Sequence, residues 1–167
     1  KYNTSNVYML PKQVKLFADG AIYSLAMQME EGYSDGFEGE WMTPLDTFEQ
    51  QMNFYWDKDY KINIHANGDL GIQMCLDIVE KLMLRKPREG HRLTLHHLGY
   101  FTAEQSKQMK KLGIEASANP YYLWALADKY TEFGLGKERA ENLVHIKSLQ
   151  DNNIPFSFHS DFGMAPM

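Results

Sequence analysis

The segment 61–69, which reads Lys-Ile-Asn-Ile-His-Ala-Asn-Gly-Asp, constrains the fold of this chain most strongly. Its β-branched run predicts a short strand that ends at His65, and the Gly68-Asp69 pair predicts a turn. Apolar residues at helical spacing follow, at Ile72, Cys75, Leu76, Val79 and Met83. The segment therefore predicts a strand followed by a helix, with a histidine at the carboxyl end of the strand. In α/β barrels and open α/β sheets, chemistry takes place at that end.

The same pattern recurs along the chain. A capping box from Thr102 to Gln105 predicts the start of one helix, and Gly113 predicts its end. The alternation of strands and helices predicts an α/β fold with a parallel sheet. The long aperiodic stretch 21–42 predicts a functional loop, and residues 1–10 predict a loop or an approach strand. We expect five strands, which end near Asp19, His65, His97, Pro120 and Asp161.

Composition excludes several classes of partner. The formal net charge of -5 gives no electrostatic reason to expect nucleic acid or an anionic membrane as partner. No apolar run approaches the roughly 20 residues that span a bilayer. The single cysteine, Cys75, excludes an internal disulfide framework, and no signal peptide is expected at the start. The sequence does not determine the cellular compartment, although the cytoplasm is favoured. It contains no glycine-rich strand-to-helix loop of the phosphate-binding pattern, so a phosphate-binding α/β domain is not expected.

Each candidate site residue also has an ordinary structural interpretation. A lone histidine such as His65 is often a core or turn residue. Lys15 alone fits a strand edge, and Asp161 alone fits a helix N-cap. Four other ionisable residues are not expected to take part in chemistry. Asp19 and Asp69 are interpreted as turn residues, and His91 and His145 are interpreted as surface residues.

Taken together, these residues predict a shared site. Side chains alternate across a strand, so we expect His97 to face the site and His96 to be turned away. Imidazole and carboxylate ligands suit a Zn²⁺-like ion, and a lysine can join them if CO₂ carboxylates its amine. The residues expected to converge at the strand ends are Lys15, His65, His97 and Asp161. The aromatic residues after the fourth strand that are expected to bind substrate are Tyr121, Tyr122 and Trp124.

Several motifs carry a resemblance to a known family. They are Val14 to Gly20, Ile64 to Asp69, His91 to His97, and Ser160-Asp161. In this order they resemble the amidohydrolase superfamily, specifically the branch of N-substituted formamide deformylase-like enzymes. The resemblance covers nearly the whole chain, and the ordered set is more specific than any single motif.

The resemblance implies both a fold and an activity. It places residues 1–167 in one partial TIM (β/α)₈ barrel domain, about strands four to eight, truncated at both ends. Lys15 would be the carboxylated metal ligand, His65 and His97 further ligands, and Asp161 both a ligand and the catalytic acid and base. One or two divalent metal ions, with Zn²⁺ favoured, would activate water to hydrolyse a small-molecule amide or a related non-peptide C–N bond.

The chain also departs from the family pattern. His96 stands where members usually carry Glu, and the His-x-His pair of the first barrel strand is absent. We therefore expect this chain alone to bind metal weakly and to be inactive, and its open sheet edges to pair in a homo-oligomer or within a longer polypeptide. The alternative is a non-catalytic or degenerate α/β barrel whose histidines are structural.

Overall fold

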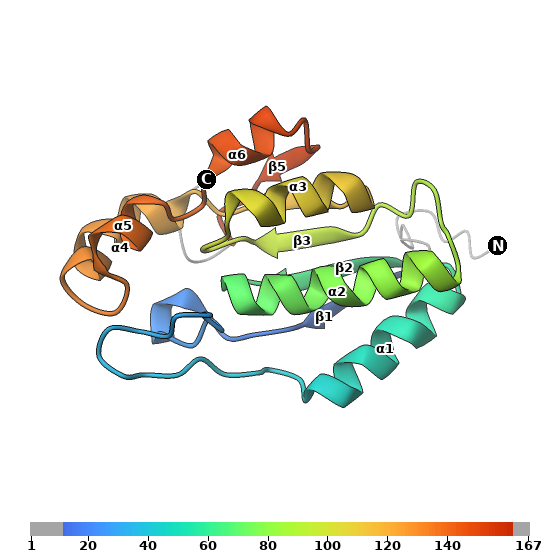
Figure 1. Cartoon of the computed structure of the whole chain (residues 1–167), viewed down its shortest axis with the longest axis horizontal. Helices are drawn as coiled ribbons and strands as arrows, with labels where there is room; N and C mark the ends of the chain where they lie inside the picture. The colour runs from blue at the N-terminus through green and yellow to red at the C-terminus, as the bar shows by residue number, and fades with distance from the viewer. Residues whose placement is uncertain (1–11, 162–167) are drawn as a thin grey trace, which may run out of the picture.

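The structure, a computed structural model, describes residues 12–161 and contains one parallel sheet with strands in sequential order (Figure 1). Leu16 lies opposite Ile64 in the register, and Ile64 lies opposite Leu95. Helices connect each strand to the next, which is the arrangement of part of a (β/α)₈ barrel, as predicted. The strands are β1 (Gln13–Phe17), β2 (Lys61–Ala66), β3 (Thr94–His97), β4 (Glu115–Ala118) and β5 (Phe156–Phe158).

The five predicted strands are confirmed, although three of them end earlier than expected. β1 ends at Phe17, before Asp19, and β4 ends at Ala118, before Pro120. β5 ends at Phe158, before Asp161. The prediction for residues 1–10 lies outside the described residues.

Helices cover one face of the sheet, and the main apolar core lies between the two layers (Figure 1). Ile62, Ile64 and Leu95 point from the strands into this core, where they are almost completely buried. Burial of such side chains contributes about 1.5–3 kcal/mol each. The helices of this layer are α1 (Leu45–Asp57), α2 (Asp69–Arg85), α3 (Ala103–Leu112) and α6 (Ile146–Asp151).

Local signals in the sequence explain the boundaries of α3. The predicted capping box is present, since the Thr102 hydroxyl accepts from the Gln105 backbone and the Gln105 side chain accepts from the Thr102 backbone. Gly113 ends the helix with a φ of 70°, a conformation that costs little without a Cβ.

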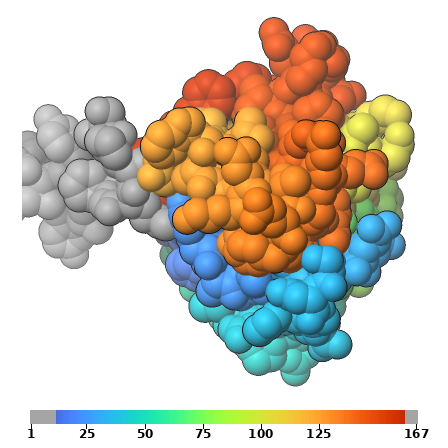
Figure 2. Space-filling model, turned by 90° about the vertical axis from the view of Figure 1, so that its left-hand side faces the viewer, coloured from blue at the N-terminus to red at the C-terminus, as the bar shows by residue number. Residues whose placement is uncertain are grey.

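A second apolar cluster closes the carboxyl end of the sheet. It joins the 3₁₀ turn η1 (Ile22–Ser24) and the following loop to α4 (Tyr121–Glu132) and α5 (Gly136–Glu141). The Tyr130 hydroxyl donates to the Ile22 carbonyl, and the Arg139 guanidinium donates to the Gly32 carbonyl. In Figure 2 the blue loop and the orange helices lie side by side over this end. The stretch 21–42, predicted to be a functional loop, is therefore packed against the strand ends.

The other face of the sheet is polar. In β2, Lys61, Asn63 and His65 are half-buried on this face, whereas Ile62 and Ile64 are buried under the helices. In a closed barrel this face would be the interior. Among residues 12–161, no helix is both long and apolar enough to cross a membrane.

Candidate metal centre at the carboxyl ends of the strands

Two of the predicted ligands meet at the ends of β2 and β3. The ring centroids of His65 and His97 are 4.4 Å apart. His97 is buried, with 2% of its surface exposed, and His65 is half-buried. The structure therefore brings these two histidines into one site, as the alternation of strands and helices predicted.

The prediction that the His96 side chain faces away from the site is wrong. Its ring centroid lies 6.2 Å from that of His97 and 6.0 Å from that of His159. The alternation rule fails here because β3 ends at His97, whose φ of 77° is followed by a φ of 53° at Leu98. The chain turns at that point, so both neighbouring rings stay near the site.

Asp161 also joins the site, together with His159, which the sequence reasoning missed. His97, His159 and Asp161 each offer a ligand atom, and these atoms lie within 4.8 Å of one another. The ring centroids of His97 and His159 are 4.9 Å apart. The signal for His159 was its place directly after the last strand, two residues before Asp161.

The partners of the ring nitrogens differ between the histidines. Nδ1 of His97 lies 3.1 Å from the Tyr122 hydroxyl, whereas Nε2 of His97 is buried and unpaired within residues 12–161. Nε2 of His65 lies 3.0 Å from the side-chain amide nitrogen of Asn67, which also donates to the Gly20 carbonyl. Nδ1 of His159 accepts from the Asp161 backbone N–H at 3.2 Å.

Burial keeps these imidazoles neutral. It lowers the pKa of His97 to about 2, with further lowering by His65 and Lys15, and it lowers the pKa of His96 to about 4. Burial also lowers the pKa of His65. A neutral imidazole retains a lone pair, which is the form that binds a metal ion.

Lys15 lies at the border of this site. Its side chain is exposed on β1, with Nζ 5.7 Å from the ring centroid of Phe17. Partial burial lowers the pKa of Lys15, and the nearby Asp161 carboxylate opposes that shift. Phe17 in turn lies against His65, with ring centroids 5.5 Å apart. Lys15 is therefore close enough to the strand ends to interact electrostatically with Asp161, although no hydrogen bond joins the two in the described part of the chain.

Asp19 has a larger structural role than the turn position that was predicted. It is fully buried, and its carboxylate accepts from the backbone N–H groups of Gln28, Asn67 and Gly68 at 2.8–3.0 Å. Burial raises its pKa to about 7, against the effect of these N–H donors. A Cβ at Gly68 would lie 2.1 Å from the Gln28 carbonyl oxygen, so the loop and the turn after β2 approach closely. Asp19 thus fixes the turn that carries Asn67.

His91 and His145, both predicted at the surface, differ in how deeply they are buried. His91 was predicted at the surface but is buried, with Nε2 2.9 Å from the Leu112 carbonyl oxygen and Nδ1 accepting from the Leu93 N–H. Both ring nitrogens are thus used to join the start of β3 to the end of α3. His145 is half-buried at the start of α6, away from this network.

The three aromatic residues predicted to bind substrate separate into two groups. Tyr122 is buried, 2% exposed, and contacts His97 through its hydroxyl. Tyr121 and Trp124 line an open hollow of about 480 Å³ with Tyr23 and Lys129. Tyr23 packs edge-on against Tyr122, with ring centroids 5.4 Å apart, so the hollow adjoins the site through this pair.

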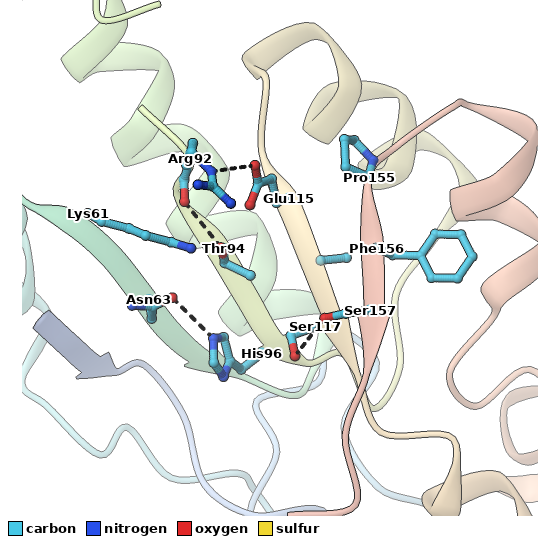
Figure 3. Close-up of a pocket in the computed structure, with 11 residues that line it drawn as sticks. Lys61, Asn63, Arg92, Thr94, His96, Glu115, Ser117, Pro155, Phe156 and Ser157 are labelled. Atoms are coloured by element: carbon cyan, nitrogen blue, oxygen red, sulfur yellow. Dashed lines mark hydrogen bonds and ion pairs between the residues drawn. The ribbon is translucent and has the colours of Figure 1, made fainter. Parts of the chain in front are cut away.

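A second hollow, of about 440 Å³, lies on the open face of the sheet (Figure 3). Nε2 of His96 lies 3.3 Å from the Asn63 side-chain oxygen at its edge, and Arg92 pairs with Glu115 at 3.2 Å. His96 thus links this polar face to the histidines at the strand ends.

The donor set fits a divalent metal ion. Imidazole nitrogens and a carboxylate are the ligands that zinc and similar ions prefer. Leaving Nε2 of His97 buried without a partner would cost free energy, and a metal ion would satisfy that atom.

The family assignment follows from a comparison with known proteins. The family model described as "Amidohydrolase family" matches residues 2–167. The chain belongs to the amidohydrolase family. The match includes the segments that hold Lys15, His65, His97 and Asp161.

Two curated proteins are similar to this chain in sequence. "Protein LONG AFTER FAR-RED 3" of Arabidopsis thaliana is 28% identical over 156 residues, which are 91% of this chain and 26% of that protein. "Putative amidohydrolase YtcJ" of Bacillus subtilis (strain 168) is 24% identical over 156 residues, 92% of this chain and 29% of that protein. The chain thus spans between a quarter and a third of the length of these two relatives.

Solved structures show the same fold. An uncharacterized metal-dependent hydrolase from Pyrococcus furiosus matches with a TM-score of 0.77 at 22% identity, over 92% of this chain and 31% of that protein. A second one, from Pyrococcus horikoshii OT3, matches with a TM-score of 0.75 at 22% identity, over 92% of this chain and 30% of that protein. At this level of identity the likeness establishes the amidohydrolase barrel fold of the chain and leaves its reaction to be argued from the site.

Proposed function

We propose that this chain supplies the metal-binding part of a metal-dependent hydrolase that acts on an amide or a related C–N bond. The observation that carries the proposal is that His97 lies close both to His65 and to Asp161, at the carboxyl ends of β2, β3 and β5. Nε2 of His97 is also buried and unpaired in the described region. Family membership and the place of the site at the carboxyl end of a barrel sheet support it.

The residues proposed to hold the metal ion are His65, His97 and Asp161, with Lys15 as a fourth ligand after carboxylation of its amine. One or two ions, with Zn²⁺ favoured, fit such nitrogen and oxygen ligands. When bound, an ion of this kind lowers the pKa of a water molecule and polarises a carbonyl group.

Asp161 is proposed as the acid and base of the reaction. Its carboxylate takes a proton from the attacking water and delivers it to the leaving nitrogen, so the C–N bond breaks without release of an amide anion. Asp161 lies after the last strand with a φ of 55°, and its ligand oxygen lies within 4.8 Å of ligand atoms of two histidines. The turn thus holds the carboxylate beside the other groups of the site.

The hollow lined by Tyr121 and Trp124 is proposed to bind the group attached to the amide. Aromatic walls favour an aryl or alkyl substituent, and Lys129 at the edge favours a neutral or anionic one. This agrees with the resemblance to the N-substituted formamide deformylase-like branch.

The rival is a degenerate barrel without turnover. Metal analysis of the full-length protein that contains this chain, combined with a screen of amides that includes N-substituted formamides, separates the two. We expect stoichiometric divalent metal and hydrolysis that a chelator abolishes. A well-folded full-length protein without metal and without hydrolysis would favour the rival.

A further inference from the structure

We infer that the hollow beside α4 selects substrates whose substituent is an aromatic ring with a carboxylate at its far end. The inference rests on the proposed function and narrows it, because it names the class of group that this hollow binds. The hollow has a volume of about 480 Å³. The residues that line it are Tyr23, Tyr121, Trp124, Ala125, Leu126 and Lys129.

Aromatic side chains from two separate segments form the walls of the hollow. The ring centroids of Tyr121 and Trp124, both on α4, lie 5.1 Å apart, with an angle of 38° between the ring planes. Tyr23 lines the same hollow from η1. Tyr23 and Trp124 are exposed, so an aryl group that enters the hollow covers aromatic surface that otherwise contacts water.

The hollow adjoins the residues that are proposed for catalysis. Tyr23 packs edge-on against Tyr122, whose hydroxyl contacts His97 at 3.1 Å. Burial raises the pKa of Tyr23, and the nearby Tyr121 and Asp161 raise it further. The Asp161 carboxylate therefore lies within electrostatic reach of the hollow, and one ligand can extend from the strand ends into it.

The charge of the hollow favours an anion. Among the described residues that line it, only Lys129 carries a charge. Asp128 and Glu132 lie close to Lys129 in sequence, but both are exposed and neither lines the hollow. No carboxylate within residues 12–161 forms an ion pair with Lys129. The Lys129 ammonium group is therefore available to the carboxylate of a bound ligand.

The position of Lys129 on α4 sets the length of the preferred substituent. Tyr121, Ala125 and Lys129 follow one another at intervals of four residues, so they lie along one side of the helix. Tyr122, beside His97, stands at the start of α4, and Lys129 follows seven residues later. At about 1.5 Å per residue this separation is roughly 10 Å along the helix axis. A benzyl group with a para carboxylate spans most of that distance, whereas a carboxylate next to the amide nitrogen does not.

The expected size of the effect follows from the exposure of Lys129. Exposed ion pairs contribute modestly, so we expect the carboxylate to raise kcat/KM about three- to fivefold, mainly through KM. Salt screens such a pair. The preference for the anionic substituent should therefore become smaller as the ionic strength rises.

The test uses the full-length protein and compares N-(4-carboxybenzyl)formamide with N-benzylformamide. We expect the wild type to prefer the carboxylated formamide about three- to fivefold in kcat/KM. In Lys129→Met, which keeps an apolar stem and loses the charge, the two formamides should be hydrolysed with equal kcat/KM. Lys111→Met is the matched control, since Lys111 is exposed on α3, pairs with Glu80 and does not line the hollow. It should keep the wild-type preference.

Salt gives a second readout that a merely structural role of Lys129 would not change. Between about 0.01 M and about 1 M salt the Debye length falls from about 30 Å to about 3 Å. The preference of the wild type should disappear over this range, whereas Lys129→Met should show no preference at either concentration. Equal preferences in the wild type and in Lys129→Met, or a wild type that prefers N-benzylformamide, would overturn the inference.

Binding without reaction separates the inference from the proposed function. NMR line broadening measures the binding of 4-methylbenzoate and of the neutral 4-methylbenzyl alcohol, neither of which has a C–N bond to hydrolyse. We expect tighter binding of the benzoate in the wild type and no difference in Lys129→Met. A preference for the benzoate that persists in Lys129→Met would place the anion elsewhere and overturn the inference. A protein that hydrolyses neither formamide, and yet binds the benzoate through Lys129, would contradict the proposed function and support the anionic hollow.

Discussion

The hydroxyl of Tyr122 lies 3.1 Å from Nδ1 of His97, and both side chains are only 2% exposed. Nε2 of His97 has no partner within the described residues, so this contact decides which ring nitrogen remains available. Tyr122 stands at the start of α4, directly after the fourth strand, whereas His97 ends the third strand. The helix that packs over the strand ends thus also orients a proposed metal ligand.

The first prediction concerns this contact. Tyr122→Phe removes the partner of Nδ1 while keeping the aromatic ring, so we expect the Zn²⁺ affinity of the full-length protein to fall about 10-fold or more. Tyr130→Phe is a matched control, because it also removes a buried hydroxyl from the same cluster, where that group donates to the Ile22 carbonyl. Competition with a chromogenic chelator measures both, and equal affinities in the two variants would show that Tyr122 does not orient His97.

A second prediction concerns Asp161 as acid and base. We expect Asp161→Asn in the full-length protein to lower turnover at least ~10²-fold while much of the metal stays bound, because the amide cannot accept the proton. Asp128→Asn replaces an exposed carboxylate on α4 and should leave turnover unchanged. Rates near those of the wild type in Asp161→Asn would mean that another group takes the proton.

The periodicity of the sequence was sufficient to predict the sheet. β2 alternates buried Ile62 and Ile64 with half-buried polar residues, and such alternation follows from strand geometry alone. The Thr102 capping box and Gly113 also act locally, so their roles in α3 could be predicted from neighbouring residues. The metal-ligand roles remain predictions for Lys15, His65, His97 and Asp161. The structure gives the positions of these side chains.

The errors came from backbone turns and tertiary burial. His96 was expected to turn away, but the positive φ of His97 ends the alternation one residue earlier than the sequence pattern implies. Asp19 could not be distinguished from a turn residue, because its N–H partners Gln28, Asn67 and Gly68 come from two distant segments. No local pattern contains that information.

Asp19 leads to a prediction on pH. Burial raises its pKa to about 7 in the folded protein, above the ordinary value of 3.8. The folded state therefore binds this proton more tightly than the unfolded state, and the resulting stabilisation is complete below about pH 4 and is lost as the pH rises through about 7. The free energy of unfolding of the wild type, minus that of Asp19→Asn, should fall over this window by more than about 1.4 kcal/mol, the equivalent of one pKa unit.

Denaturant titrations of the full-length protein between pH 4 and 8 measure that difference. Asp35→Asn is the control, because Asp35 is exposed and its carboxylate accepts a hydrogen bond from the nearby Phe37 backbone N–H. A difference between wild type and Asp19→Asn that grows with pH would show that the N–H donors outweigh burial.

Trp124 tests the proposed substrate hollow. Its side chain is 79% exposed, so Trp124→Ala should change the free energy of unfolding by less than about 0.5 kcal/mol. We expect KM for an aryl-substituted amide to rise roughly 3–10-fold with little change in kcat, because a contact with an aromatic wall is lost. Leu84→Ala, at an equally exposed position on α2, should change neither value. The same KM in all three proteins would remove Trp124 from the substrate site.

The central claim is that the strand ends form a metal site in which His97 is a ligand. It is tested most directly by measuring the bound metal in the purified full-length protein, as the wild type, as His97→Gln and as His145→Gln. His145 is half-buried at the start of α6 and is not among the ligands, so its variant serves as the control. We predict stoichiometric divalent metal in the wild type and in His145→Gln, and its loss from a folded His97→Gln variant. Equal metal content in all three proteins, or none in the wild type, would contradict the account.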